Sequence, residues 1–500
     1  MQSIASTTLL CNLPNRHLIH QLNAFAEGQG VQLYLVGGSV RDVLLNRPIT
    51  DLDFALAGDA ISFAKAFADE IDGAFVKLEE QPPTARIVIR ETRLVLDFAR
   101  FRDETLEADL RRRDLTINAM AIDFSSLLTQ PTVNLIDPCN GLRDLEQRVL
   151  RFPNEQVVHD DPLRMLRVYR FAAQLGFEIH EATIGLIREH KHRLWLGDRN
   201  ETLRGGIAPE RIRDELMKIL EVRDATTCLR QMDETCLLSQ IIPETEKMRG
   251  VQQNDYHHLD VWEHSLLALQ MFEATPIPDT LRSYREEIKA YLRQHLIYDK
   301  RRRQILKLAL LLHDVAKPAT KTMSPQGNTR FIGHEKLGAE MAVAITNRLR
   351  LGGKVARPMS CLVRNHLYLM NLVNAGAPTR RAITRFLRNT GDDWLGVLLL
   401  SYADLRASQG ILRQPGDVSK TEALMKRIAD LYYQEIRPMI TRGRLITGDD
   451  IMQAFGLAPG VKIGRILKHI EDLQFQGQVH TSEEALKVAQ AFLETMKPQR

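Results

Sequence analysis

Residues 33–58 read LYLVGGSVRDVLLNRPITDLDFALAG, and this stretch decides the fold. It begins with an apolar run that predicts a buried strand, and Gly37 and Gly38 follow at once. Glycine allows φ > 0 and lets backbone N–H groups come close to an anion. Ser39 is a suitable N-terminal cap for a helix over residues 40–44. Strand, turn and helix start together therefore predict a phosphate cradle.

The same stretch ends in a second predicted strand, over residues 51–56. Side chains alternate along a strand, so Asp51 and Asp53 point to one side while the apolar residues between them point into the core. Two neighbouring carboxylates repel each other, and a divalent cation removes that repulsion. A Gly-Gly pair alone usually marks only a tight turn, and an Asp-x-Asp motif alone usually marks the solvated end of a strand. The two motifs together, at this spacing, are a much more specific indication of a functional site. A metal held beside a phosphate cradle is the arrangement that nucleotidyl transfer requires.

The segments GGSVRDVLL, residues 37–45, and DLDFA, residues 51–55, resemble the head motif of a known family. That family is the class II tRNA nucleotidyltransferases together with the bacterial poly(A) polymerases. The resemblance implies an α+β fold that starts with a Pol-β-like nucleotidyltransferase head, a mixed sheet with helices. It also implies that Asp51 and Asp53 are catalytic and bind Mg²⁺.

Composition narrows the class of protein. The chain has 500 residues, which suggests roughly three domains. Its 67 Lys and Arg against 63 Asp and Glu give a net charge of +4, so any nucleic-acid contact must come from local patches. The five cysteines are scattered without a CxxC pair, which argues against a disulfide scaffold or a thiolate zinc site. No signal-peptide or membrane-span pattern is present, so we expect a soluble cytoplasmic protein with no membrane partner.

Two more segments of the predicted head carry candidate residues. Residues 85–90 and 93–98 predict a strand hairpin that contains Asp97. In isolation Asp97 is best interpreted as a polar strand residue, but the resemblance makes it a third catalytic carboxylate, which accepts the proton of the attacking hydroxyl or helps to bind metal. Residues 112–120, RRDLTINAM, resemble the second family motif. Their arginines lie at the edge of a buried segment, where guanidinium forks suit triphosphate oxygens.

The segment DDPLR, residues 160–164, opens a predicted long helix. Asp161 and Arg164 are three residues apart on one helix face, so they form either a cap with a local ion pair or a pair that reads a base. The resemblance favours base reading, because this motif selects CTP or ATP without a nucleic-acid template. The predicted nucleotide-binding residues are Gly37, Gly38, Arg41, Arg112, Arg113, Asp114, Asn118, Asp161, Arg164, Arg167 and Arg170.

One departure from the family concerns which nucleotides are added. Only residues 103–110, DETLEADL, separate Arg102 from the second motif. Family members that add C, C and A commonly carry a longer flexible loop here, and a short segment resembles the members that add only CC. The sequence leaves open whether CCA, CC alone or A alone is added.

A second set of candidate ligands follows at predicted helix boundaries. A histidine or aspartate on an apolar helix is more often a satisfied core residue than a ligand, but six of them, with His313 and Asp314 adjacent, favour a metal site. Imidazole with carboxylate suits Mn, Fe, Ni, Co or Mg better than structural zinc. The order resembles the HD phosphohydrolase signature, which implies one or two metals that activate water on a phosphoester. The predicted ligands are His264, His313, Asp314, His334, His366 and Asp404.

Two local features complete the predicted organisation. Residues 1–30 predict a short amphipathic helix that leads into the head. Near the other end, Lys462, Arg465 and Lys468 recur every three residues and are candidate phosphate contacts.

The resemblance covers almost the whole chain and implies four parts. These are a head at 1–150, a helical nucleotide- and RNA-binding neck at 151–250, an HD domain at 251–410 and a helical tRNA-binding tail at 411–500. The predicted function is addition of C and/or A from CTP and ATP to the 3′ end of tRNA, with an additional metal-dependent phosphohydrolase activity. Three alternatives stay open: a poly(A) polymerase, a metal phosphohydrolase with an RNA-binding head, and a non-catalytic RNA-binding module. The sequence does not give the oligomeric state.

Overall fold

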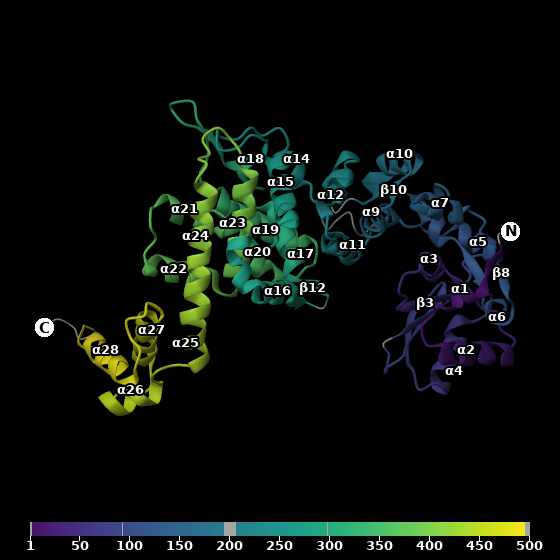
Figure 1. The fold of residues 1–500 in the computed structure, drawn as a ribbon, viewed down its shortest axis with the longest axis horizontal. Coiled ribbons are helices and arrows are strands. Elements are labelled where there is room, and N and C mark those ends of the chain that lie inside the picture. The colour runs from purple at the N-terminus through teal and green to yellow at the C-terminus, as the bar shows by residue number, and fades with distance from the viewer. Residues whose placement is uncertain (1–2, 93, 195–206, 298, 496–500) are drawn as a thin grey trace. The chain divides into compact units, whose positions relative to one another are not determined.

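The computed structural model describes residues 3–92, 94–194, 207–297 and 299–495 (Figure 1). The chain divides into two compact units, Met1–Ile242 and Pro243–Arg500. The predicted four-part division is finer than this, and its boundaries stay predictions. Within the described ranges, no helix is both long enough and apolar enough to cross a lipid bilayer.

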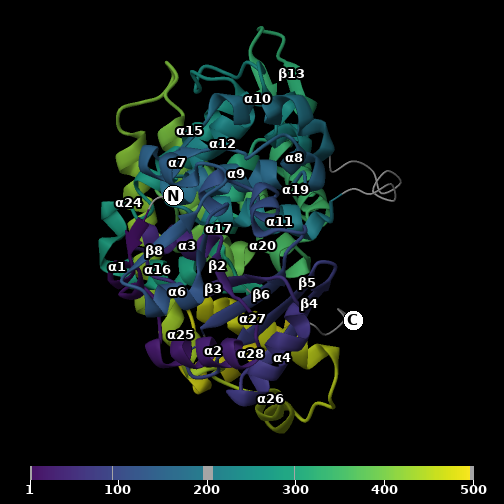
Figure 2. The same ribbon diagram turned by 90° about the vertical axis from the view of Figure 1, so that its right-hand side faces the viewer.

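The first unit is built on an eight-stranded mixed sheet. Its strands are β1 (Ser3–Ala5), β2 (Tyr34–Val36), β3 (Asp51–Leu56), β4 (Ala74–Glu80), β5 (Pro83–Val88), β6 (Val95–Arg100), β7 (Ala121–Asp123) and β8 (Thr132–Ile136). They are ordered β1-β8-β7-β2-β3-β6-β5-β4, and Figure 2 shows β2, β3, β6 and β5 following one another. β3 and β6 pair in parallel, whereas β3 pairs antiparallel with β2 and β6 antiparallel with β5. The predicted α+β head is confirmed.

Helices cover the sheet and continue beyond it to the end of the first unit. They are α1 (Ser6–Leu10), α2 (Arg16–Gly28), α3 (Gly38–Leu44), α4 (Ala60–Glu70), α5 (Leu106–Arg111), α6 (Phe124–Thr129), α7 (Gly141–Gln147), α8 (Gln156–Asp160), α9 (Arg164–Leu175), α10 (Glu181–His190), α11 (Pro209–Glu221), α12 (Ala225–Glu234) and α13 (Leu238–Ile241). Two 3₁₀ turns, η1 (Thr116–Asn118) and η2 (Lys191–Leu194), and the short parallel strands β9 (Val149–Leu150) and β10 (Glu178–Ile179) lie among them.

Strand alternation in β3 separates an apolar face from a carboxylate face. Phe54 stacks on Phe98 with ring centroids 5.2 Å apart and meets Phe124 of α6 edge-on at 4.9 Å. Phe63 of α4 packs on the same Phe98 ring at 5.4 Å. Successive side chains of a strand point to opposite faces of the sheet. Because Phe54 is buried on one face of β3, Asp51 and Asp53 lie on the other face.

Two predicted helix boundaries in this unit need correction. Residues 1–30 are not one helix, because Ser3–Ala5 forms an edge strand, β1, that pairs antiparallel with β8 before α1 and α2 begin. The long helix predicted from Asp160 begins only at Arg164. Asp160 instead ends α8, and Asp161 has an extended backbone, with φ −151° and ψ 98°. The predicted hairpin is confirmed as β5 and β6, although Arg93 lies outside the described residues.

The second unit is mostly helical. Its helices are α14 (Glu244–Met248), α15 (Val261–Ala274), α16 (Arg285–Arg293), α17 (Arg302–Leu312), α18 (Lys317–Thr320), α19 (His334–Arg348), α20 (Gly353–Asn365), α21 (Tyr368–Asn374), α22 (Arg380–Thr390), α23 (Trp394–Ala407), α24 (Asp417–Asp430), α25 (Arg437–Arg442), α26 (Gly448–Phe455), α27 (Val461–Phe475) and α28 (Ser482–Thr495). It also contains the 3₁₀ turns η4 (Asp279–Tyr284) and η5 (Gly391–Asp393), a π-helical stretch η6 (Leu431–Ile436) and the short antiparallel pairs β11 (His295–Ile297) with β12 (Lys300–Arg301) and β13 (Lys321–Met323) with β14 (Thr329–Phe331).

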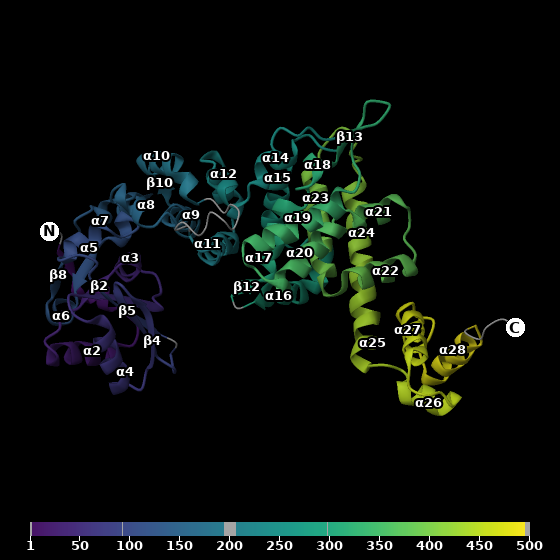
Figure 3. The same ribbon diagram turned by 180° about the vertical axis from the view of Figure 1, so that it is seen from behind.

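Two apolar cores hold this unit together. α17 is buried at every position except Arg303, which explains the apolar run from Leu308 to Leu312. The last three helices, α26, α27 and α28, gather beyond α25 (Figure 3). They enclose a small core of their own that includes Ile451, Ile466 and Ala489. Thr447 caps α26 by accepting a hydrogen bond from the backbone N–H of Asp450.

Candidate functional site

A cavity of about 820 Å³ opens in the first unit. Its lining comes from β3, β5, β6, α3, α9 and the segment around η1. Every residue predicted from the sequence for catalysis or nucleotide binding lines this cavity. These residues are Gly37, Gly38, Arg41, Asp51, Asp53, Asp97, Arg112, Arg113, Asp114, Asn118, Asp161, Arg164, Arg167 and Arg170.

Three carboxylates meet on the polar face of the sheet. Asp53 of β3 is the register partner of Asp97 in β6, and Asp51 lies two residues before Asp53 on the same side. Burial raises the pKa of Asp53 to about 6; Arg113 counteracts this effect, whereas Asp97 and Asp51 add to it. A half-buried carboxyl with two acidic neighbours fits a divalent cation, because the ion supplies the missing positive charge.

The Gly-Gly turn and Ser39 position these carboxylates. Gly37 has φ +68°, and a Cβ there would lie 2.9 Å from Nη1 of Arg113 and 3.4 Å from Oδ2 of Asp53. Gly37 therefore meets the predicted need for glycine, whereas Gly38 is an ordinary first residue of α3. The prediction that Ser39 caps this helix is wrong. Its hydroxyl accepts from the backbone N–H of Asp53 at 2.7 Å and donates to the carbonyl of Asp51 at 3.2 Å, so it holds β3 in place.

Most of the arginines around the cavity are held by acidic or amide partners. Arg41 donates to Asn118 at 2.7 Å and pairs with Asp42. Arg113 lies 3.1 Å from Asp109, a buried carboxylate. These partners fix the guanidinium planes while leaving nitrogen atoms at the cavity wall, which suits the binding of a polyphosphate.

The carboxylate of Asp114 is occupied by hydrogen bonds from other side chains of the protein. Both Nε and Nη2 of Arg167 donate to its Oδ2, at 2.9 and 2.6 Å, and Asn118 donates to its Oδ1 at 3.0 Å. Burial alone would raise the pKa of Asp114, but Arg167 and Asn118 outweigh this and hold it well below its usual value. Asp114 therefore joins η1 to α9 as a permanent anion.

The two residues predicted to read the base both face the cavity but do not pair with each other. Asp161 is held by Arg211 of α11 at 2.7 Å. The buried Arg164 donates to the carbonyl of Val157 at 3.2 Å. The alternative of a local Asp161–Arg164 ion pair is therefore not observed, and each side chain presents its remaining atoms separately.

Three arginines that line the cavity were not among the predicted site residues. Arg86 donates to both oxygens of Asp97 at 2.8 Å, and Arg211 holds Asp161. Arg102 also lines the cavity, and among the described residues its guanidinium has no hydrogen bond or ion pair. The predicted hairpin register would have placed Arg86 opposite Asp97, but no local pattern indicates Arg211.

The second unit contains another candidate site, centred on the buried Asp314 at the end of α17. Its carboxylate oxygens lie 3.2 Å from Nε2 of His313, 3.3 Å from that of His334 and 3.7 Å from that of His366. In each of these three rings, Nδ1 lies 2.6–2.8 Å from the backbone carbonyl three residues earlier. Such contacts place the proton on Nδ1 and leave Nε2 for a metal.

His264 and Asp404 complete the predicted ligand set. Nε2 of His264 lies 2.9 Å from Oδ1 of Asp404 and 3.7 Å from Oδ2 of Asp314. Two unpredicted residues join them: the His257 ring meets the His264 ring at 4.7 Å, and Nζ of Lys317 lies 2.6 Å from Asp314. The structure thus brings together all six predicted ligands from five separate helix ends or helices.

The electrostatics of this cluster fit a bound cation. Burial lowers the pKa of His366 to about 3, so the ring is neutral, as a ligand must be. Burial would also lower the pKa of His313, but Asp314 reverses this and raises it to about 10. Within the described residues, neither buried oxygen of Asp314 has a well-aligned hydrogen bond. A cation would displace the proton on His313 and satisfy these oxygens. A cavity of about 330 Å³ reaches the cluster.

Three segments of the chain match known protein families. Residues 33–151 match the "Poly A polymerase head domain", residues 176–248 the "Probable RNA and SrmB- binding site of polymerase A", and residues 261–390 the "HD domain". The first match contains the carboxylate cluster, and the third contains His264 to His366.

Curated relatives and solved structures extend this result over nearly the whole chain. An A-adding tRNA nucleotidyltransferase of Deinococcus radiodurans is 32% identical over 92% of this chain and 95% of its own length. A CC-adding tRNA nucleotidyltransferase of Thermus thermophilus is 30% identical over 90% and 91%. The structure of a Thermotoga maritima CCA-adding enzyme complexed with tRNA shares the fold, with a TM-score of 0.63, 22% identity and coverage of 99% and 100%. These likenesses confirm the family predicted from the motifs, and the chain belongs to the tRNA nucleotidyltransferase family.

Proposed function

We propose that this chain adds C and/or A from CTP and ATP to the 3′ end of tRNA, without a nucleic-acid template. The observation that carries the proposal is the convergence of three carboxylates and a set of oriented arginines on one cavity of about 820 Å³. The names of the relatives favour tRNA as substrate over poly(A) synthesis.

In the proposed reaction the terminal 3′-hydroxyl of tRNA attacks the α-phosphate of the nucleotide, and pyrophosphate leaves. Asp51 and Asp53 would hold Mg²⁺, which activates the hydroxyl and stabilises charge on the phosphate oxygens. Asp97 accepts the hydroxyl proton or helps to hold the ion, and two hydrogen bonds from Arg86 orient its carboxylate.

The triphosphate needs positive charge that the cavity already provides. Arg41 and Arg113 lie beside the Gly37 turn, where their partners limit side-chain motion. Arg102 is exposed and carries no internal partner among the described residues, so its charge is free for an anion. These arginines steady the triphosphate while the hydroxyl attacks.

Asp161 and Arg164 choose the base. The carboxylate of Asp161 accepts from an exocyclic amine, and Arg164 donates to a ring nitrogen or carbonyl oxygen. Arg211 keeps Asp161 at the cavity wall, and the buried position of Arg164 limits its rotation. Fixed donors and acceptors favour a base that matches both.

The short connection between β6 and α5 bears on which bases are added. It comprises residues 101–105, and Thr105 already caps α5 by accepting from the N–H of Ala108. Its length favours an enzyme that stops after CC. Relatives that add A and relatives that add CC match this chain at 32% and 30% identity, so identity alone does not choose between them.

Two further proposals concern the second unit. Lys462, Arg465 and Lys468 lie exposed along α27, which suits contact with tRNA phosphates. The cluster around Asp314 would hold a divalent transition metal or Mg²⁺ and would support hydrolysis of a phosphoester. The resemblance to the HD signature points to a phosphatase or a 2′,3′-cyclic phosphodiesterase.

The proposal is tested with three tRNA substrates, ending before CCA, after the first C and after CC. Each is incubated with the full chain and either CTP or ATP, and the product lengths are read at nucleotide resolution. CTP should extend the first by two residues and the second by one. If only CC is added, ATP leaves the third unchanged. Long adenylate tails without cytidine would contradict the tRNA assignment.

A further inference from the structure

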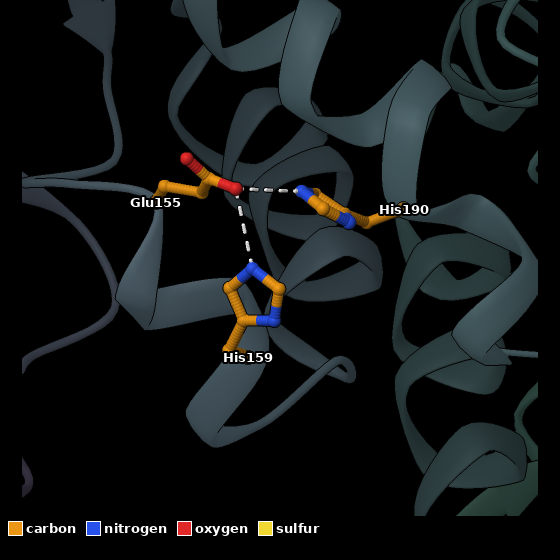
Figure 4. Close-up of side chains that lie close together, drawn as sticks. All are labelled: Glu155, His159 and His190. Atoms are coloured by element: carbon orange, nitrogen blue, oxygen red, sulfur yellow. Dashed lines mark hydrogen bonds and ion pairs between the residues drawn. The ribbon is translucent and has the colours of Figure 1, made fainter.

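A side-chain cluster outside both cavities connects α8 to the end of α10. Glu155 directly precedes α8, His159 lies one turn further along it, and His190 is the last residue of α10. Oε1 of Glu155 lies 3.2 Å from Nε2 of His159 and 3.2 Å from Nε2 of His190. Figure 4 shows both rings directing these nitrogens at the same oxygen.

The three donor atoms have the spacing of metal ligands. They lie within 4.8 Å of one another. Bonds of about 2.0–2.1 Å at tetrahedral angles place neighbouring donors about 3.3 Å apart, close to the 3.2 Å that separates Oε1 of Glu155 from each ring nitrogen. Two imidazoles with one carboxylate suit zinc and similar ions and leave a fourth position open. We propose that Glu155, His159 and His190 bind a divalent transition metal of the zinc class.

Exposure and charge are consistent with such a site. The side chains of Glu155, His159 and His190 are 57%, 37% and 10% exposed, so an ion can enter from solvent while His190 anchors the site. Hydrogen bonds from the two rings lower the pKa of Glu155, which is therefore an anion at neutral pH. Glu155 thus supplies one full negative charge for the binding of a divalent cation.

One neighbouring residue, Arg193 of η2, competes with a metal ion for the His159 ring. Its guanidinium contacts Nδ1 of His159 and also donates to the carbonyl of His159 at 3.4 Å. A ring that binds metal through Nε2 carries its proton on Nδ1, so Arg193 must leave that nitrogen when the ion binds. The proposal therefore predicts that removal of Arg193 strengthens metal binding.

Binding would restrain a turn that matters to the head cavity. His159 immediately precedes Asp160 and Asp161, which line that cavity and pair with Arg112 and Arg211. An ion that joins α8 to α10 stabilises the folded form of this segment by an amount that grows with the ratio of free ion concentration to Kd.

The test is equilibrium dialysis of the full chain against Zn²⁺, with bound metal measured by mass spectrometry. The wild type is expected to hold one more equivalent than the His190→Ala variant, because the ions of the other two sites are common to both. His192→Ala, which removes an exposed histidine two residues away, is the matched control and should bind like the wild type. Equal metal content in wild type and His190→Ala would overturn the proposal.

Two more variants keep the result interpretable. If circular dichroism shows that His190→Ala does not fold, His159→Ala removes a more exposed ligand and should lose the same equivalent. Arg193→Ala should bind Zn²⁺ several-fold more tightly than the wild type. Unchanged or weaker binding in Arg193→Ala would mean that the two rings only donate hydrogen bonds to Glu155, and the proposal would be wrong.

Discussion

Asp97 lies directly beside Asp53, as its register partner in the parallel pair of β3 and β6, and Arg86 holds its carboxylate with two hydrogen bonds of 2.8 Å. The parallel pairing brings a third acidic group next to the Asp-x-Asp pair without any insertion in either strand. Because Arg86 approaches from β5, the same sheet supplies both the carboxylate and the cation that orients it.

Asp97→Asn is expected to lower kcat for CMP transfer by about 10²-fold or more, because an amide neither accepts the hydroxyl proton nor carries charge to an ion. The KM for CTP should change little, since Asp97 is not among the residues expected to hold the triphosphate. Steady-state kinetics on tRNA that lacks CCA measure both values. Arg86→Gln, which keeps the carboxylate, is the control and should retain more activity; a fully active Asp97→Asn enzyme would exclude the proposed role.

The pKa of Asp53, raised to about 6, predicts a pH-dependent stability in the metal-free protein. The folded state favours the neutral carboxyl, so this contribution to the free energy of unfolding is fully present below about pH 4 and is lost as the pH rises through 6. Asp53→Asn cannot ionise. Relative to the wild type, it should therefore gain on the order of 2 kcal/mol in unfolding free energy between pH 4 and pH 7.

Urea unfolding of both proteins in a chelating buffer, across this pH range, measures that difference. Adding Mg²⁺ at pH 7 should stabilise the wild type and leave Asp53→Asn nearly unchanged. A difference between the two proteins that does not vary with pH would show that Asp53 is an ordinary carboxyl.

Local sequence patterns predicted which face of β3 carries Asp51 and Asp53, because this depends only on residues that are close together in sequence. The alternation of Asp51 and Asp53 with apolar residues is enough to put both on one side of β3. The hairpin register would also have paired Arg86 with Asp97. Local patterns do not predict contacts between residues that are distant in sequence, such as Arg112 and Asp160, which are 48 residues apart.

The same limit explains the errors near α9. Asp160 and Asp161 read as a helix start, but each carboxylate is bound by an arginine, and Arg211 is 50 residues away from its partner. Those ion pairs favour a turn over the predicted first turn of helix. The cap prediction for Ser39 failed for a related reason, because β3 offers its hydroxyl two backbone partners.

Asp161→Ala is expected to weaken base selection more than catalysis. The kcat/KM for the correct nucleotide should fall by about 10- to 100-fold, because a hydrogen bond to a charged group is worth roughly 1.5–3 kcal/mol, and the ratio of CTP to ATP use should approach one. Competition between the two nucleotides on one tRNA measures this ratio. Arg211→Ala should shift it in the same direction but less, since Asp161 remains; an unchanged ratio in Asp161→Ala would place base reading elsewhere.

His313→Ala in the second unit should separate the two proposed activities. Removing a buried ligand beside Asp314 is expected to abolish the metal bound at this cluster and the hydrolysis of a 2′,3′-cyclic phosphate. CMP transfer should stay within about two-fold of the wild type, because the residues proposed for catalysis and nucleotide binding lie in the first unit. Loss of transfer in a folded His313→Ala protein would instead favour a phosphohydrolase whose head only binds RNA.

The most direct measurement compares the wild type with an Asp51→Asn, Asp53→Asn double variant in the transfer of radiolabelled CMP to tRNA that lacks its 3′ CCA. The substitutions keep the side-chain shapes on β3 and remove the two charges proposed to hold Mg²⁺. The wild type should incorporate CMP only when Mg²⁺ is present, and the folded double variant should incorporate none above background. Incorporation by the double variant at the wild-type rate would contradict the assignment of this site.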